Sequence, residues 1–118
     1  MTTISSHILD STTGQDASGV WVTCHRLLGT SESEAVFETQ SGDDGRILIE
    51  INTDTDPLKT GYELVFYSGE YFAKTQSSED NSSMVSEVVV RVDLSEVPLC
   101  CHVPLLIAPH NYTLWWSR

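Results

Sequence analysis

Four segments of the chain alternate apolar and polar residues with a period of two, and no other feature of the sequence limits its fold as strongly. This period places every second side chain on the same side of an extended strand, so each segment has one apolar face and one more polar face. The four segments are residues 19–27, 46–51, 62–67 and 86–94. Turn-forming residues lie at 12–19, 29–34, 41–45 and 53–57. We therefore predict an all-β sandwich in which each sheet is covered on one side, with one short helix at 69–76.

The length and the charge of the chain restrict its organisation and its partners. At 118 residues it is expected to form a single domain, residues 1–118, with one hydrophobic core. Its 17 acidic and 6 basic side chains give a formal net charge of -11. Nucleic acids and anionic membrane surfaces need a basic face, so neither is an expected partner. No apolar stretch reaches the roughly 20 residues of a membrane-spanning helix.

The three cysteines, Cys24, Cys100 and Cys101, indicate free thiols and not a disulfide framework. Their number is odd, two are adjacent, and the N-terminal residues lack the basic and apolar regions of a secretory signal. We therefore expect a reducing compartment and mostly buried thiols. Zinc binding is disfavoured, because residues 100–102 lack the usual ligand spacing and point to alternate faces of a strand.

Residues 102–107 predict an outward-facing histidine at the start of a strand. The apolar residues of this segment alternate and form the face expected in the core, which leaves His102 facing water or another subunit. Pro104 lacks a backbone N–H, so we expect the strand to be interrupted or bulged there. The same alternation disfavours a catalytic dyad of Cys101 and His102, whose side chains face opposite ways. The residues expected in the core are Val103, Leu105 and Ile107.

The other candidate residues each have an ordinary explanation when taken singly. A lone histidine is usually a surface residue or a satisfied core residue, and this applies to His7, His25 and His110 as well as to His102. Arg46 follows an Asp-Gly hairpin turn, where an arginine is commonly solvated. Alternatively, its rigid guanidinium is a fixed pair of donors for an anionic or carbonyl-rich ligand.

Several segments, in order along the chain, resemble the transthyretin-related proteins and, within them, the branch of 5-hydroxyisourate hydrolases. The resemblance covers residues 5–116, which is nearly the whole chain. It is carried by the segments HILDSTTGQDASGVWVTCHRL, DDGRI, GYELVFYSGEYFA, SEVVVRV and HVPLLIAPHNYTLWW. No single segment is decisive, but HILD, DGR and HVPLL at these distances are specific together.

The resemblance implies a transthyretin-like (prealbumin-like) β-sandwich of two four-stranded sheets with one short helix. Four chains would form a homotetramer, as a dimer of dimers, with active sites at the interface between the dimers. The implied reaction uses no metal or cofactor. Water opens the lactam of 5-hydroxyisourate, an oxidation product of urate, to give 2-oxo-4-hydroxy-4-carboxy-5-ureidoimidazoline in purine degradation. The implied catalytic residues are His7, Arg46 and His102, a set that the hormone-carrying transthyretins lack.

Opening a cyclic amide requires an activated water, a donor for the developing oxyanion and a proton for the leaving nitrogen. Imidazole accepts a proton near neutral pH, so His7 or His102 could activate the water, and the spacing does not decide between them. We expect His7 to be the base or proton relay and His102 to orient the water or the substrate. Arg46, a permanent cation, would stabilise the oxyanion.

The C-terminal residues depart from the enzyme branch, which ends in Tyr-Arg-Gly-Ser and lines its site with these residues. The same four places hold Trp115, Trp116, Ser117 and Arg118. The residues implied to bind substrate are therefore Trp116, Ser117 and Arg118, with the cation displaced by two positions. A tryptophan pair on the last strand also fits a subunit interface, with one ring in the core and the other lining the channel.

Two alternatives to the hydrolase stay open from the sequence. One is a catalytically altered transthyretin-like carrier that binds a small planar ligand in the tetramer channel, which the changed C-terminus favours. The other is a structural domain like the prealbumin-like repeats of surface adhesins, although the sequence contains no second copy. The expected compartment is the cytoplasm, with the peroxisome as the alternative, because the sequence ends in Trp-Ser-Arg and not in Ser-Lys-Leu.

Overall fold

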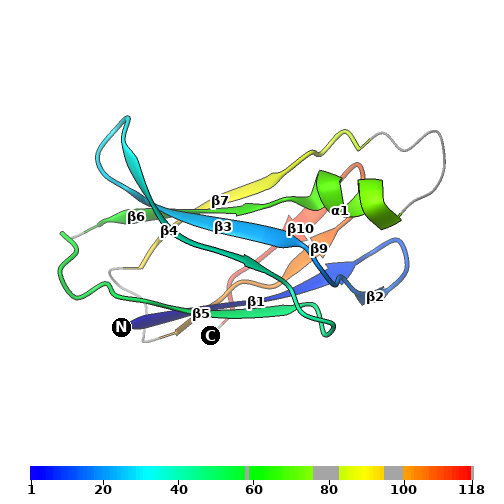
Figure 1. The fold of residues 1–118 in the computed structure, drawn as a ribbon, viewed down its shortest axis with the longest axis horizontal. Helices are drawn as coiled ribbons and strands as arrows, with labels where there is room; N and C mark the ends of the chain where they lie inside the picture. The colour runs from blue at the N-terminus through cyan, green and yellow to red at the C-terminus, as the bar shows by residue number, and fades with distance from the viewer. Residues whose placement is uncertain (58, 76–82, 95–99, 118) are drawn as a thin grey trace.

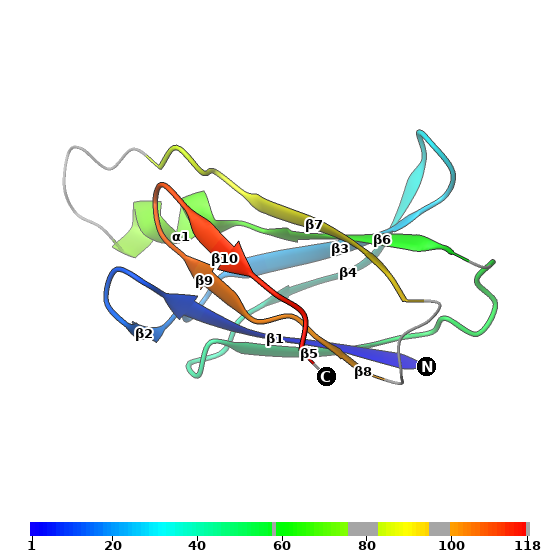
Figure 2. The same cartoon turned by 180° about the vertical axis from the view of Figure 1, so that it is seen from behind.

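The computed structural model describes residues 1–57, 59–75, 83–94 and 100–117, which form two β-sheets packed face to face (Figures 1 and 2). The described strands are β1 (Thr2–Asp10), β2 (Gln15–Asp16), β3 (Trp21–Leu27), β4 (Ser33–Gln40), β5 (Arg46–Ile51), β6 (Gly61–Phe66), β7 (Val88–Asp93), β8 (Cys100–His102), β9 (Leu105–Ile107) and β10 (Tyr112–Leu114). Helix α1 (Ser68–Thr75) lies within one residue of its predicted bounds. The predicted all-β sandwich with a short helix is confirmed. No helix in the described ranges is both long enough and apolar enough to cross a membrane.

The first sheet is organised around β1, which has partners on both sides. On one side β1 pairs antiparallel with β5 and, further along, with β2. On the other side it pairs parallel with β8 and then with β9, and β9 pairs antiparallel with β10. β8 and β9 are separated by Val103 and Pro104, where the sequence predicts an interruption. If β8 and β9 are counted as one interrupted strand and the two-residue β2 is set aside, this sheet has the four expected strands.

The second sheet has the order β4-β3-β6-β7, and all its pairings are antiparallel. β4 is an edge strand whose residues are mostly exposed, and its sequence has no period-two pattern that would predict it. The turn predicted at 29–34 is too long, because β4 begins at Ser33. The turn is closed by the backbone N–H of Leu28, which donates to the carbonyl of Glu32 at 2.8 Å.

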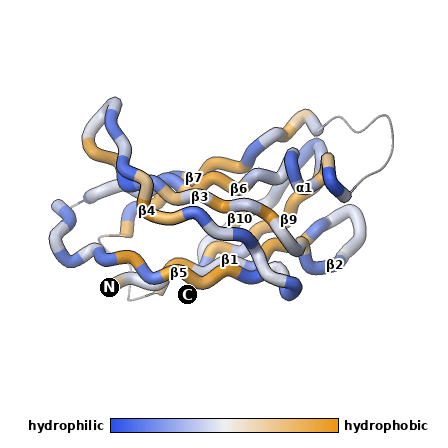
Figure 3. The backbone as a smooth tube through the Cα atoms, in the orientation of Figure 1, coloured by the Kyte–Doolittle hydropathy of each residue, from blue (hydrophilic) through white to orange (hydrophobic). Residues whose placement is uncertain are grey.

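The core lies between the two sheets and is formed by the apolar faces that the alternation predicts. Along the strands, hydrophobic and hydrophilic positions follow one another at short intervals (Figure 3). Val103, Leu105 and Ile107 are all buried, as predicted for the segment that follows His102. The largest fully buried side chains are Tyr62, Phe66, Phe72, Ile4, Ile8, Ile51, Leu64, Leu105, Ile107, Val20, Val22 and Val88.

The inward face of β1 also carries polar residues, and each is hydrogen bonded. The Ser6 hydroxyl donates to the carbonyl of Val103 at 2.5 Å. The buried Asp10 carboxylate accepts from the Tyr71 hydroxyl of α1 at 3.0 Å. Burial, together with this bond to Asp10, raises the pKa of Tyr71 to about 12. These bonds fix β1 against the β8–β9 segment and against the helix.

Gly45 sets the start of β5, and replacing it is expected to destabilise the fold. Its φ is 72°, and a Cβ there would lie 2.4 Å from the carbonyl oxygen of Ile8 and 3.2 Å from the backbone nitrogen of Ala17. Both neighbours are backbone atoms, so neither can move aside easily. We expect Gly45→Ala to lower the free energy of unfolding by about 2–4 kcal/mol, measured by urea denaturation.

Gly42→Ala is the matched control for Gly45→Ala, because it adds the same methyl group to the same turn. A Cβ at Gly42 would lie 3.3 Å from a carboxylate oxygen of Asp44, a side-chain atom that needs to shift by only a few tenths of an ångström, and the φ of Gly42 is not positive. Equal stability of the two variants would contradict the steric role assigned to Gly45.

Candidate active site

The three predicted catalytic residues lie on the outward face of the first sheet, on three neighbouring strands. His7 is on β1, and Arg46 of β5 is its direct partner across the ladder. His102 is on β8 and is the partner of Ser5, two residues before His7 on β1. Facing residues of a ladder, and residues two apart on one strand, point to the same side of a sheet. The structure therefore brings His7, Arg46 and His102 to one face.

A pocket of about 450 Å³ lies on this face, and both Arg46 and His102 line it. Its volume lies within the range of small-molecule sites. His7 is not among the lining residues, although it is the ladder partner of Arg46. The other lining residues are Ser5, Ser6, Asp44, Ile47 and Leu48.

His102 is held by a hydrogen bond from within the sheet. The Ser5 Oγ lies 2.7 Å from Nδ1 of His102. A hydroxyl can donate or accept, so this contact fixes the ring without fixing its tautomer. With Nδ1 engaged, Nε2 is the nitrogen left for water or substrate. Ser5 is not among the residues predicted from the sequence, where its signal was its position two residues before His7 on the same strand face.

His7 is held by a carboxylate, and this pairing was also missed. Nε2 of His7 lies 2.7 Å from Oδ1 of Asp16 on β2. The side chains are 24% and 43% exposed, respectively. The sequence signal was the turn at 12–19, since a hairpin there returns the chain alongside β1.

Arg46 is positioned by the turn before it. Its backbone N–H donates to the carboxylate of Asp44 at 3.0 Å, and the carbonyl of Gly45 accepts from Ile8 of β1 at 2.8 Å. The Arg46 side chain is exposed, and its guanidinium has no hydrogen-bond or ion-pair partner among the described residues. It is therefore a cation that points out of the sheet toward whatever occupies the pocket.

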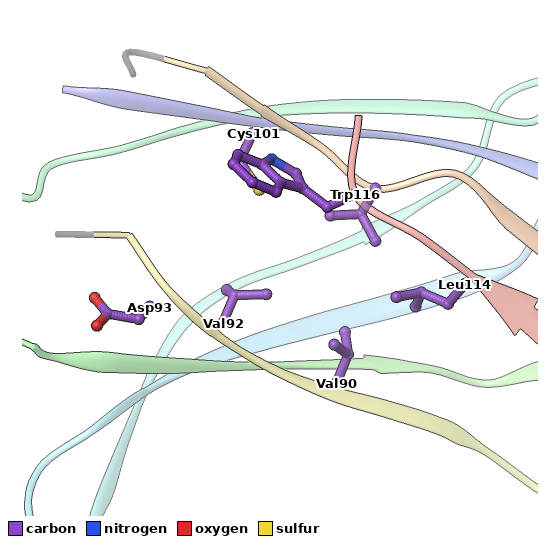
Figure 4. A pocket seen from close by; sticks show the side chains of 7 residues that line it. Val90, Val92, Asp93, Cys101, Leu114 and Trp116 are labelled. Carbon is purple, nitrogen blue, oxygen red and sulfur yellow. The ribbon is translucent and has the colours of Figure 1, made fainter. Parts of the chain in front are cut away.

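The structure separates the residues that were predicted to bind substrate. Ser117 forms a β-bridge with His102, and its N–H donates to the His102 carbonyl at 2.8 Å. This pairing places Ser117 on the same face as His102. Trp116 points the other way and, with Cys101, lines a second, apolar pocket of about 260 Å³ (Figure 4). Arg118 lies outside the described residues.

The two tryptophans are both accessible in the single chain. Trp115 is 43% exposed and Trp116 is 47% exposed, so neither ring is buried in the core. Trp116 faces a pocket lined by residues of both sheets, among them Val92 and Cys101, and not the packed core, so the prediction that one of the two rings lies in the core is wrong. Two large apolar side chains near one edge form the kind of surface that a protein partner covers.

The cysteines are free, and two of the three are buried, as predicted. Burial raises the pKa of the Cys24 thiol to about 12 and also raises the pKa of Cys101. Cys101 is in the core while His102 faces the outer pocket, so the two do not form a thiol–imidazole dyad. Over the described ranges, no three His, Cys, Asp or Glu side chains are placed to hold a metal ion.

The fold and the outward-facing residues define a transthyretin-like β-sandwich protein with a candidate small-molecule site. The chain belongs to the HIUase/Transthyretin family, whose model matches residues 4–116. It is 31% identical over 112 residues to the 5-hydroxyisourate hydrolase of Halalkalibacterium halodurans, with 95% of this chain and 94% of that protein covered. The family and the fold that the sequence predicts are thus confirmed.

Solved structures give the same result. The 5-hydroxyisourate hydrolase of Klebsiella pneumoniae matches with a TM-score of 0.76 and 27% identity, over 99% of this chain and 100% of that one. A solved (S)-allantoin synthase matches with a TM-score of 0.77 and 26% identity over 98% of this chain. This chain spans only 43% of the length of that synthase chain.

Proposed function

We propose that the protein is a 5-hydroxyisourate hydrolase, an enzyme that opens the cyclic amide of 5-hydroxyisourate with water. The observation that carries the proposal is the convergence of Arg46 and His102 on one outward pocket, with His7 opposite Arg46 in the same ladder. The family membership supports it, as do relatives named 5-hydroxyisourate hydrolase that match along nearly the whole chain.

The proposed step adds water across the amide bond. The water oxygen bonds to the carbonyl carbon while a histidine takes the water proton, and the C–N bond then breaks as that proton passes to the leaving nitrogen. We assign His7 as base or relay and His102 as the group that orients water or substrate. Arg46 stabilises the negative charge on the carbonyl oxygen, since its guanidinium is always protonated. This scheme calls for neither a metal nor a cofactor.

Among the predicted substrate-binding residues, Ser117 has the strongest support. It lies beside His102 and faces the same way. Arg118 follows it directly in the sequence and stays a proposed contact. Trp116 lines the other pocket, so its proposed contact with substrate finds no support within the single chain.

We further propose a homotetramer, as a dimer of dimers, in the cytoplasm, with the peroxisome as the alternative compartment. Leu48 lines the candidate pocket and is 72% exposed, and the two tryptophans are nearly half exposed, so apolar surface is available for other copies to cover. Covering the pocket would remove water from it and strengthen the interaction of Arg46 with charge on the substrate. Light scattering on the purified protein tests the assembly. Three free thiols fit a reducing compartment.

The proposed activity is tested with freshly generated substrate. Urate and uricase supply 5-hydroxyisourate, whose spontaneous decay is followed by absorbance and sets the baseline. Adding the protein is expected to accelerate the decay in proportion to its concentration. A folded protein that leaves the decay unchanged would reject the hydrolase and favour the carrier, in which case binding of a planar ligand would be measured next.

A further inference from the structure

The carboxylate of Asp16 reaches His7 along the outward face of the first sheet. Asp16 is the ladder partner of Leu9, and Leu9 and His7 are two residues apart on β1, so all three share this face. Its Oδ1 lies 2.7 Å from Nε2 of His7. Asp16 also lies close to the turn that precedes Arg46. A Cβ added at Gly45 in that turn would be 3.3 Å from the Cβ of Asp16. Among the described residues, His7 thus has one charged residue bonded to it, Asp16 on β2, and another opposite it in the ladder, Arg46 on β5.

This contact fixes which nitrogen of His7 carries a proton. An ionised carboxylate can only accept hydrogen bonds, so Nε2 must be the donor. In the neutral ring, Nδ1 is then the only nitrogen that can accept a further proton. His102 differs, because its partner is a hydroxyl that accepts or donates equally well. The structure thus distinguishes the two histidines, which the sequence could not.

We propose that Asp16 is a positioning residue for His7 in the hydrolysis, an inference that rests on the proposed function. Asp16 holds the ring with Nε2–H directed at its carboxylate. When Nδ1 takes a proton from water, the resulting imidazolium lies beside this negative charge and is stabilised by it. The proton then passes from Nδ1 to the leaving nitrogen, and Asp16 stays ionised throughout. This is the role that an aspartate has toward histidine in a hydrolytic triad.

The kinetic test compares Asp16→Ala with Asp43→Ala. Asp43 lies in the turn before β5, is exposed and bonds to Ser18 and not to histidine, so its replacement removes the same charge without touching His7. We expect Asp16→Ala to lower kcat by about 10-fold, less than for a buried triad aspartate because Asp16 is 43% exposed. KM should change by less than about 2-fold, because Asp16 acts through His7 and not on the substrate. In a His7→Ala background, Asp16→Ala should have no further effect.

A measurement independent of activity tests the pair itself. Long-range ¹H–¹⁵N NMR of the imidazole rings reports which nitrogen carries the proton, and wild-type His7 should show Nε2–H, with the Nδ1–H form appearing in Asp16→Ala but not in Asp43→Ala. A His7 proton on Nδ1 in the wild type overturns the pairing whatever the activity. Equal kcat values for the Asp16 and Asp43 variants overturn the positioning role. A wild-type protein that does not accelerate the decay overturns the proposed function instead, so the failures are distinguished by different measurements.

Discussion

His102→Ala is expected to lower kcat/KM for 5-hydroxyisourate by roughly 10²–10⁴-fold, because it removes the imidazole that lines the pocket and is proposed to orient the water or the substrate. The side chain is only partly buried and is held by one hydrogen bond to Ser5, so the variant should keep its fold. Its backbone continues to pair with β1 and with Ser117, since those bonds use main-chain atoms. The loss should therefore appear in catalysis and not in stability.

His110→Ala is the matched control for this prediction. His110 is exposed and lies between β9 and β10, outside the candidate pocket. Initial rates of decay, measured against the spontaneous baseline, should be unchanged in this variant. The assignment of His102 to the site would be rejected if both alanine variants retained wild-type rates.

The strands that the sequence predicts well are those whose inward faces are wholly apolar. In β3, the inward residues Val22 and Cys24 are both fully buried, as is Val20 just before the strand, and the intervening residues are more exposed. β5 and β7 follow the same rule. The pattern works because a sheet covered on one side selects its side chains by the direction in which each one points.

β1 is not predicted by the apolar alternation, although it is the central strand of its sheet. Its inward face alternates isoleucine with the polar residues Thr2, Ser6 and Asp10, all of them buried. These polar groups form their hydrogen bonds only in the folded chain. Ser6, for example, donates to the carbonyl of Val103, which is 97 residues away in the sequence. β4 is not predicted for the opposite reason: its residues are mostly exposed, so it has no buried face that would require apolar side chains. The local sequence pattern therefore predicts neither of these two strands.

Part of the candidate site can be predicted from the local sequence pattern, and part depends on which strands pair with one another. The outward direction of His102 follows from the alternation around it, and the structure confirms it. That His7, Arg46 and His102 share a face depends on the pairings of β1 with β5 and β8, which no local pattern specifies. The family resemblance supplied that grouping. Ser5 and Asp16 were missed because a serine or an aspartate in a polar stretch becomes informative only when its partner is known.

Arg46→Ala is expected to lower kcat/KM by about 10²–10³-fold, the loss typical of removing one donor from a developing oxyanion. The turn that precedes Arg46 fixes its backbone, and its guanidinium has no partner elsewhere among the described residues, so little else should change. The protein carries a formal net charge of -11, and Asp44 lines the same pocket. Without Arg46, the pocket lining keeps the carboxylate of Asp44 but has no permanent cation to stabilise a developing negative charge.

Two further variants separate the charge of Arg46 from its geometry. Arg46→Lys keeps a cation but loses the planar pair of donors, so its activity should lie between those of the wild type and Arg46→Ala. Arg91→Ala is the matched control, because Arg91 is on β7 of the other sheet and pairs with Glu63 at 3.0 Å. Steady-state rates that fall equally in Arg46→Ala and Arg91→Ala would mean that positive charge matters only for the overall field of the protein. A loss confined to position 46, and only partly restored by lysine, would mean that the reaction depends on a donor pair held at the mouth of the pocket by the turn at Gly45.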